Sequence, residues 1–537
     1  MKVKRFLIIA LACIPAFLCG AQGFVIIEDK HPHELNPQIT SYSSDAQILS
    51  GLYEGLFSYN PITLEPQFAI ASDFKVSRDK KRWTINLRPE AKFSNGESIT
   101  ASSVRDSFIQ LLSTPEAPYA SLLDIIYNAY EYRNGLCEAD DVGISVAEDY
   151  VLNIKLRAPA NYLPKVLCHS SFSIIHRSPT VYSGAYMLEE KTEDSYVLKK
   201  NPYYWDAENV KLEEITFFQS DDEVENAFLF NTGKADWVTN NVKVDNVLNK
   251  TSIQVGGEFG TAYYFFKLSN RKPKAVGRAD AGAGAADPAE PAFNIWDFPE
   301  FRNALLEAVP WKSLRSEAAV PAGTFVYPLS GYNSPDPFDY TDLAEAERMM
   351  NDAREKYGIS LEKELPLVFE VSEFTLTEEK KALLVDAFKP LGVNLQIREL
   401  PSYLYLRNVP YSDADMFAYT WIGDFADPLA FLELFRSDSS LNDSGWSDAE
   451  YDALIEKAAA VADFERYELL SAAEKILLDG GMVLPVYHPV SFNLINLNEV
   501  GGWAANAFDV HPLKYLYRKE AKSTIPNVVM KTSGLLH

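Results

Sequence analysis

The chain has 537 residues and a formal charge of −25 at pH 7, with 47% hydrophobic and 13% aromatic residues. One hydrophobic core rarely organises a chain of this length, so a globular protein with two or three lobes is expected. Such an acidic chain would be repelled by phosphate backbones, and no Lys/Arg-rich segment offsets the charge, which argues against nucleic acid as a partner.

Residues 1–21 have the pattern of an export signal, in which three cations precede an apolar run that ends at Cys19. The run is too short to span about 30 Å of hydrocarbon, so a cleaved signal is favoured over a membrane anchor. Cleavage after Ala21 would release the chain outside the cytoplasm, in the periplasm or cell envelope. Lipid attachment at Cys19 is the alternative, although Leu18 is bulky for the position before a lipidated cysteine.

Histidines and cysteines are few after this leader. His31 and His33 lie near the new N-terminus with no third ligand nearby in sequence, so we expect exposed side chains and no metal site. Cys137 and Cys168 could form one disulfide in an exported protein, and two unpaired thiols are the alternative. Cys168 and His169 are adjacent, which does not give the geometry of a nucleophile and its base.

Helix and strand patterns alternate through the first third of the chain. A helix is expected in the segment 44–57, with a cap at Ser44 or Asp45 and apolar residues at helical spacing. Residues 81–88 and 150–156 alternate apolar and polar side chains as half-buried strands do, and a capped helix is expected between them at 100–112.

A strand–helix–strand unit is predicted in the second half. Residues 365–371 and 393–400 have strand patterns, and residues 377–392 between them have a threonine cap and a glycine stop. This spacing predicts a parallel pair of strands in an α/β fold. A helix capped by Asp342 is expected at 342–358, while residues 271–293 are rich in Ala, Gly and Pro and predict a flexible insertion.

No familiar catalytic or phosphate-binding motif occurs, and His169, His176 and His488 are scattered along the chain. The segment 421–431, WIGDFADPLAF, carries Asp424 and Asp427 three residues apart. Gly423 and Pro428 indicate a turn, which argues against an acid pair on one helix face. A carboxylate beside Trp421 is instead suited to anchor a cationic group, and a purely structural role in the turn is the alternative.

Several further segments resemble, in the same order, the family 5 extracellular solute-binding proteins, which are the oligopeptide- and dipeptide-binding components of ABC importers. The resemblance covers roughly residues 27–515. It rests on residues 52–104 (LYEGLFSYNPITLEP and onward), SGAYML (183–188), KKNPYYWD (199–206), GKADW (233–237), EFRNALLEAV (300–309), WIGDFADPLAFLELF (421–435), AEYDALIEKA (449–458) and GMVLPVY (481–487).

This resemblance implies an α/β, two-lobed, three-domain periplasmic-binding (type II) fold with a hinge and a ligand cleft between the lobes. Lobe one would comprise residues 24–44, 177–264 and 490–520, with an inserted domain at 45–176. Lobe two would comprise residues 265–489, and residues 521–537 would be a tail. The hinge crossings would fall near residues 263–270 and 488–493.

The resemblance also implies a ligand site without catalytic residues, metal or cofactor. Asp424 would pair with the α-ammonium group of a short peptide, and the backbone of residues 420–423 would pair with the peptide as an added strand. The expected ligand-binding residues are Thr420, Trp421, Ile422, Gly423, Asp424 and Phe425, and Asp427 is expected to brace the turn. A monomer that serves ABC permease subunits in the inner membrane is implied.

One departure from the family pattern leaves the identity of the ligand undecided. Some oligopeptide binders carry an arginine three residues before the tryptophan, where this chain has Ala418, and Arg407 is too distant to replace it. A peptide receptor that catalyses nothing is the first interpretation. The same scaffold binding a nickel complex, haem, a sugar or an opine is the second, and a surface interaction protein or chaperone with a vestigial cleft is the third.

Overall fold

The computed structural model describes residues 23–40, 43–115, 117–269, 294–316, 318–329, 331–337, 339–423, 425–461 and 463–520. The export signal, the acylation candidate Cys19, the 271–293 segment, the 521–537 tail and the predicted anchor Asp424 lie outside these residues. Within the described chain, no helix combines the length and apolar character needed to cross a bilayer.

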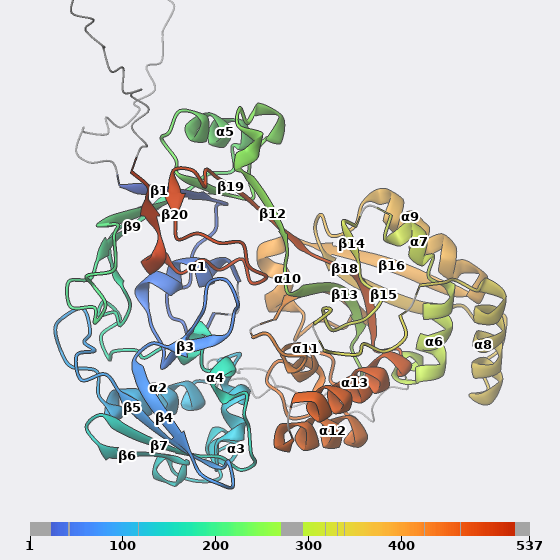
Figure 1. Cartoon of the computed structure of the whole chain (residues 1–537). Helices are drawn as coiled ribbons and strands as arrows, with labels where there is room; N and C mark the ends of the chain where they lie inside the picture. The colour runs from blue at the N-terminus through green and yellow to red at the C-terminus, as the bar shows by residue number, and fades with distance from the viewer. Residues whose placement is uncertain are drawn as a thin grey trace, which may run out of the picture.

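Two large sheets organise the molecule, one in each half (Figure 1). The first has seven strands in the order β12 (Ile253–Gly257), β19 (Val490–Ile495), β11 (Trp237–Thr239), β1 (Phe24–Glu28), β10 (Glu214–Gln219), β9 (Ser195–Lys200) and β8 (Tyr186–Lys191). Strand β1 lies parallel to both β10 and β11 in the middle of this sheet. Its apolar sequence, FVIIE, suits a strand covered on both faces.

The second sheet has six strands in the order β14 (Val320–Pro321), β18 (Val483–His488), β13 (Gly260–Phe266), β17 (Met416–Ile422), β15 (Leu365–Ser372) and β16 (Val393–Leu400). Strands β15 and β16 are parallel and are joined through α9 (Glu378–Phe388), so the predicted strand–helix–strand unit is confirmed. Thr377 caps α9 by accepting from the Lys380 backbone N–H. Asp342 caps α8 (Leu343–Lys356) in the same way, through Glu345.

Smaller sheets and helices complete the two halves. A four-stranded sheet has the order β4 (Ala71–Val76), β5 (Arg82–Leu87), β7 (Val151–Lys155), β6 (Ile144–Glu148), and two strand pairs are β2 (Phe57–Tyr59) with β3 (Pro66–Phe68) and β20 (Val500–Gly501) with β21 (Tyr517–Arg518). The remaining α-helices are α1 (Ser43–Leu52), α2 (Ala101–Ser113), α3 (Ala129–Arg133), α4 (Leu163–Val166), α5 (Glu223–Asn231), α6 (Pro299–Ala308), α7 (Trp311–Leu314), α10 (Ser402–Asn408), α11 (Leu429–Leu432), α12 (Ala449–Ala460) and α13 (Asp463–Asp479). The 3-10 turns used below are η1 (Ala120–Ile125), η8 (Glu433–Phe435) and η9 (Leu513–Tyr515).

The first helix is shorter than the apolar pattern predicts. It ends at Leu52, because the next residues pair with distant segments: the carbonyl of Leu52 accepts from Gly184 N, and the carbonyl of Glu54 accepts from Ile174 N. Helix α1 packs on the seven-stranded sheet, in one apolar cluster with residues of β8, β9 and η9. We therefore propose that the inserted domain begins after α1, near Leu56, and not at residue 45.

The chain crosses between the two large sheets twice (Figure 1). The first crossing joins β12 to β13 through Glu258 and Phe259, and the second joins β18 to β19 through Pro489. The two crossings are hydrogen-bonded side by side, since Glu258 N donates to Pro489 O at 2.9 Å. Because β13 already belongs to the second sheet, we place the first crossing at 258–259, ahead of the expected boundary at 264.

The two halves also touch each other through side chains that lie outside these crossings. The guanidinium of Arg466 in α13 lies 4.1 Å from the ring centroid of Tyr162, which precedes α4 in the other half. Ser440 Oγ donates to the Pro118 carbonyl at 2.8 Å, again from one half to the other. In the described structure the two halves are therefore in direct side-chain contact.

Candidate functional site

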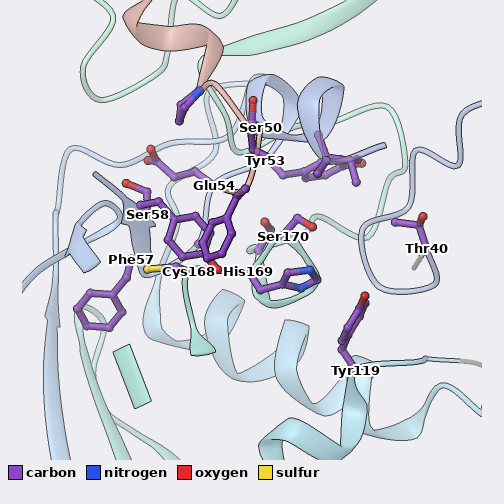
Figure 2. A pocket seen from close by; sticks show the side chains of 18 of the residues that line it. Thr40, Ser50, Tyr53, Glu54, Phe57, Ser58, Tyr119, Cys168, His169 and Ser170 are labelled. Carbon is purple, nitrogen blue, oxygen red and sulfur yellow. The ribbon is translucent and has the colours of Figure 1, made fainter. Parts of the chain in front are cut away.

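A cavity of about 190 Å³ lies where the two halves meet. Most of its wall comes from the half that holds the seven-stranded sheet, and one stretch comes from the end of β17 in the other half. The lining consists of residues 40, 46, 49–50, 53–55 and 57–59, residues 119, 168–170 and 173, residues 420–423, and residues 508, 510, 512 and 514. Figure 2 shows the side chains of Tyr53, Glu54, Ser58 and His169 around the hollow.

The β17 wall contains the predicted stretch Thr420, Trp421, Ile422 and Gly423. The indole of Trp421 is fixed because its Nε1 donates to the Ala430 carbonyl at 2.8 Å. Gly423 is sterically required, since a Cβ there would lie 2.4 Å from the buried ring of Phe259. Contacts on the side away from the cavity therefore fix Trp421 and Gly423 in this part of the wall.

One edge of this wall has no strand beside it. Strand β17 pairs with β13 along its whole length, but with β15 only at Met416 and Phe417. At Ala418 the hydroxyl of Tyr405 takes the place of a strand and bonds both N and O at 2.9 Å. Among the described strands, none covers the far edge of residues 419–422, so that backbone can accept an added strand.

The charged groups of the described lining are Glu54 and Lys514, which form a partly enclosed ion pair. Lys514 Nζ lies 2.7 Å from Glu54 Oε1. The Glu54 carboxylate also accepts from Tyr204 OH and from Trp205 Nε1, each at 2.6 Å. Burial lowers the pKa of Lys514, but the Glu54 carboxylate outweighs this and leaves it raised, so the ammonium stays charged.

His169 and Tyr119 form the opposite side of the cavity. Their ring centroids are 4.4 Å apart, and burial lowers the pKa of His169 to about 4, so the imidazole is neutral at physiological pH. The arrangement offers aromatic faces, one ion pair and a free strand edge. These features suit it to hold a molecule.

The family described as bacterial extracellular solute-binding proteins, family 5 Middle, matches residues 65–443 of the chain. The chain belongs to this family. Among its relatives is the dipeptide-binding protein DppE of Bacillus subtilis, which is 25% identical over 528 residues that cover 94% of this chain and 92% of DppE.

Solved structures of the family share the fold. The Escherichia coli murein tripeptide-binding protein MppA has a TM-score of 0.77 at 22% identity, covering 93% of this chain and 99% of MppA. Listeria monocytogenes OppA bound to peptide has a TM-score of 0.75 at 21% identity, covering 94% and 100%. The predicted type II fold of this family 5 solute-binding protein is thereby confirmed.

Two other residues singled out from the sequence, Phe425 and Asp427, have different roles in this family 5 protein. Phe425 is fully buried and does not line the cavity, so the ligand contact expected for it is replaced by packing in the core. Asp427 does brace the turn: its carboxylate accepts from Leu429 N at 3.0 Å and pairs with Arg466 at 2.8 Å and 3.2 Å.

The disulfide expected between Cys137 and Cys168 is not formed, because both cysteines are free in the structure. Cys137 Sγ donates to the Asn128 carbonyl at 3.7 Å, and Cys168 Sγ donates to the Pro164 carbonyl at 3.2 Å. Cys168 lines the cavity, and burial raises its pKa well above the usual range, which keeps it a thiol.

The expectation for the two N-terminal histidines is also wrong in part. His33 is buried, with its ring between the carboxylates of Glu28 and Asp45. Neighbours in sequence gave no sign of this, because Asp45 reaches His33 from helix α1. Lys514 and Glu54 were missed for a similar reason, since 460 positions separate them in the chain.

Proposed function

We propose that this protein is an extracytoplasmic receptor that captures short peptides in the cavity and delivers them to a membrane-embedded ABC importer. The observation that carries the proposal is the uncovered edge of residues 419–422 beside the cavity. A peptide added there would bond through its backbone, which tolerates many sequences. The peptide-binding relatives DppE and OppA support this choice of ligand.

Two charged groups would fix the direction of the peptide. Asp424, which lies outside the described residues, follows the wall at 420–423 directly and would pair with the α-ammonium group. Lys514 would receive the peptide carboxylate in the absence of an arginine at position 418. Its ammonium bonds to Glu54 and, at 3.3 Å, to Tyr204 OH, and no third acceptor lies within hydrogen-bond distance in the described chain.

Calorimetry is carried out with three forms of one tripeptide, which are the free peptide, its N-acetyl derivative and its C-terminal amide. The comparison tests the ligand class and both proposed anchors. We expect saturable 1:1 binding that weakens at least tenfold on acetylation or amidation. Asp424→Ala should abolish the difference in affinity between the free and the acetylated peptide. Lys514→Gln should abolish the difference in affinity between the free peptide and its C-terminal amide. The matched control is Lys200→Gln, in which the last residue of β9 loses its ion pair with the exposed Glu213.

The outcomes separate the parts of the proposal. If native mass spectrometry of the purified protein shows a single non-peptide ligand and no tripeptide binds, the peptide assignment is wrong. If the tripeptide binds but wild type does not discriminate against the amide, the peptide assignment stands and the role of Lys514 is wrong.

A further inference from the structure

A second group of ligating side chains lies outside the cavity, at the carboxyl end of β1. Glu28 ends that strand, and His31 and His33 follow it in the sequence EDKHPH. One donor atom from each of these three residues lies within 4.8 Å of the others. None of the three lines the cavity between the halves.

The separations suit a divalent transition metal. His31 Nε2 and His33 Nδ1 are 3.2 Å apart, close to the roughly 3.3 Å expected between two imidazole nitrogens that are about 2.05 Å from one tetrahedral zinc ion. Glu28 Oε1 lies 2.5 Å from the other ring nitrogen, His33 Nε2, so the side chains must turn for one nitrogen of His33 to face both His31 and Glu28. Two imidazoles and a carboxylate are a donor set typical of Zn²⁺ with an open fourth position.

Neighbouring groups orient each donor, as they do around metal ions in proteins. The backbone carbonyl of Asp29 lies 2.9 Å from His31 Nδ1 and accepts a hydrogen bond from it, which leaves the lone pair on Nε2 directed at His33. The amide of Gln219 donates to Glu28 Oε1 at 3.0 Å. Asp45 lies 2.9 Å from His33 Nδ1 and in turn accepts from Thr40, so it orients this ring when Nε2 is the nitrogen that binds the ion.

We propose that Glu28, His31 and His33 bind a zinc-class divalent cation. The ion would fasten the segment that follows β1 onto the seven-stranded sheet. It would also connect to the ligand cavity, because Asp45, which positions His33, is held by Thr40, and Thr40 lines that cavity. The alternative is a metal-free cluster, in which a protonated His33 donates to both carboxylates.

Untagged full-length mature protein, stripped with a chelator and desalted, is titrated with ZnCl₂ in a calorimeter. We expect one Zn²⁺ per chain and a higher thermal midpoint, and Co²⁺ should give the visible absorption bands of a tetrahedral site. His31→Gln is the informative variant because His31 is half-buried and the hydrogen bond from its ring to the main chain is local. It should weaken Zn²⁺ binding at least tenfold.

The matched control is His176→Gln, which removes a histidine that pairs with Glu97 at 3.1 Å and bonds to no other histidine among the described residues. It should leave zinc affinity unchanged. Glu28→Gln is a second test of the donor set and should also lose affinity, provided its circular dichroism matches wild type. No saturable 1:1 binding by wild type, or equal binding by wild type and His31→Gln, overturns the site and leaves the metal-free cluster.

Discussion

Replacing Asp427 by alanine should destabilise the second half of the molecule, because this carboxylate is the ionic partner of a buried arginine. Arg466 is 3% exposed, and its Nη2 and Nε lie 2.8 Å and 3.2 Å from the two oxygens of Asp427. Without that carboxylate, Arg466 keeps the Ala458 carbonyl at 3.0 Å and the ring of Tyr162. Neither of these is an anion.

Removing one partner of a buried ion pair typically costs about 3–5 kcal/mol, since the remaining charge is left uncompensated. The Asp427→Ala change also removes the acceptor of Leu429 N, which adds about 1 kcal/mol. We therefore expect a loss of about 4–6 kcal/mol in the free energy of unfolding, a large part of the 5–15 kcal/mol that is typical of proteins. Because residues 425–429 follow the cavity wall, peptide affinity should fall as well.

Urea unfolding followed by tryptophan fluorescence measures this loss. The control is Asp479→Ala, in the helix α13 that also holds Arg466. Asp479 pairs with Lys475 on the surface, where both side chains are more than 60% exposed, so its removal should change stability by less than about 0.5 kcal/mol. The double variant Asp427→Ala/Arg466→Met removes the stranded charge and should recover about 2 kcal/mol. A loss below 1 kcal/mol for Asp427→Ala, or no recovery in the double variant, would refute the reasoning.

Three further changes follow from single contacts. Burial raises the pKa of Glu474 to about 7, so the folded state holds a proton that the unfolded state loses near pH 4.5. Stability should therefore fall by about 3 kcal/mol as pH rises from 4.5 to 7. Thermal midpoints measured between pH 4 and 8 should show this decline in wild type but not in Glu474→Gln. Ser440→Ala deletes the hydrogen bond to Pro118 that joins the halves, so calorimetry should show peptide affinity about fivefold lower at an unchanged thermal midpoint; equal affinity would contradict a role in closure. Gly423→Ala should cost about 1–3 kcal/mol in urea unfolding through its clash with Phe259, and a wild-type midpoint would show that the wall can relax.

Local sequence signals predicted the parts of the fold that depend on local chemistry. The caps at Thr377 and Asp342 lie where side-chain acceptors precede apolar periodicity, and both are formed. The parallel pair β15 and β16 follows from helix-length spacing between two apolar runs. The role of Asp427 was predictable for the same reason, because an aspartate before Pro428 commonly holds a turn.

The features that the sequence did not predict depend on contacts between distant segments. Helix α1 keeps an apolar pattern to residue 56 but stops at Leu52, where main-chain bonds to Gly184 and Ile174 replace helical ones. The burial of His33 needs Asp45 from helix α1, and the charge of Lys514 in the cavity needs Glu54. No local propensity carries information about pairings of this kind.

The origin of the cavity wall links ligand binding to the position of the two halves. Thr420, Trp421 and Ile422 belong to the six-stranded sheet, whereas Glu54, Tyr119 and Lys514 belong to the other half. A peptide that binds the β17 edge and Lys514, as proposed, would contact both halves at once. Its binding energy would therefore differ between arrangements that bring the halves together and arrangements that separate them. Such a difference is what a ligand needs to shift a conformational equilibrium. The crossings at 258–259 and 489 are the only described main-chain links between the two large sheets, so the halves would move relative to each other about these residues. We therefore predict that peptide makes the wild-type protein more compact in solution scattering. This compaction should be lost in Lys514→Gln while the protein stays folded.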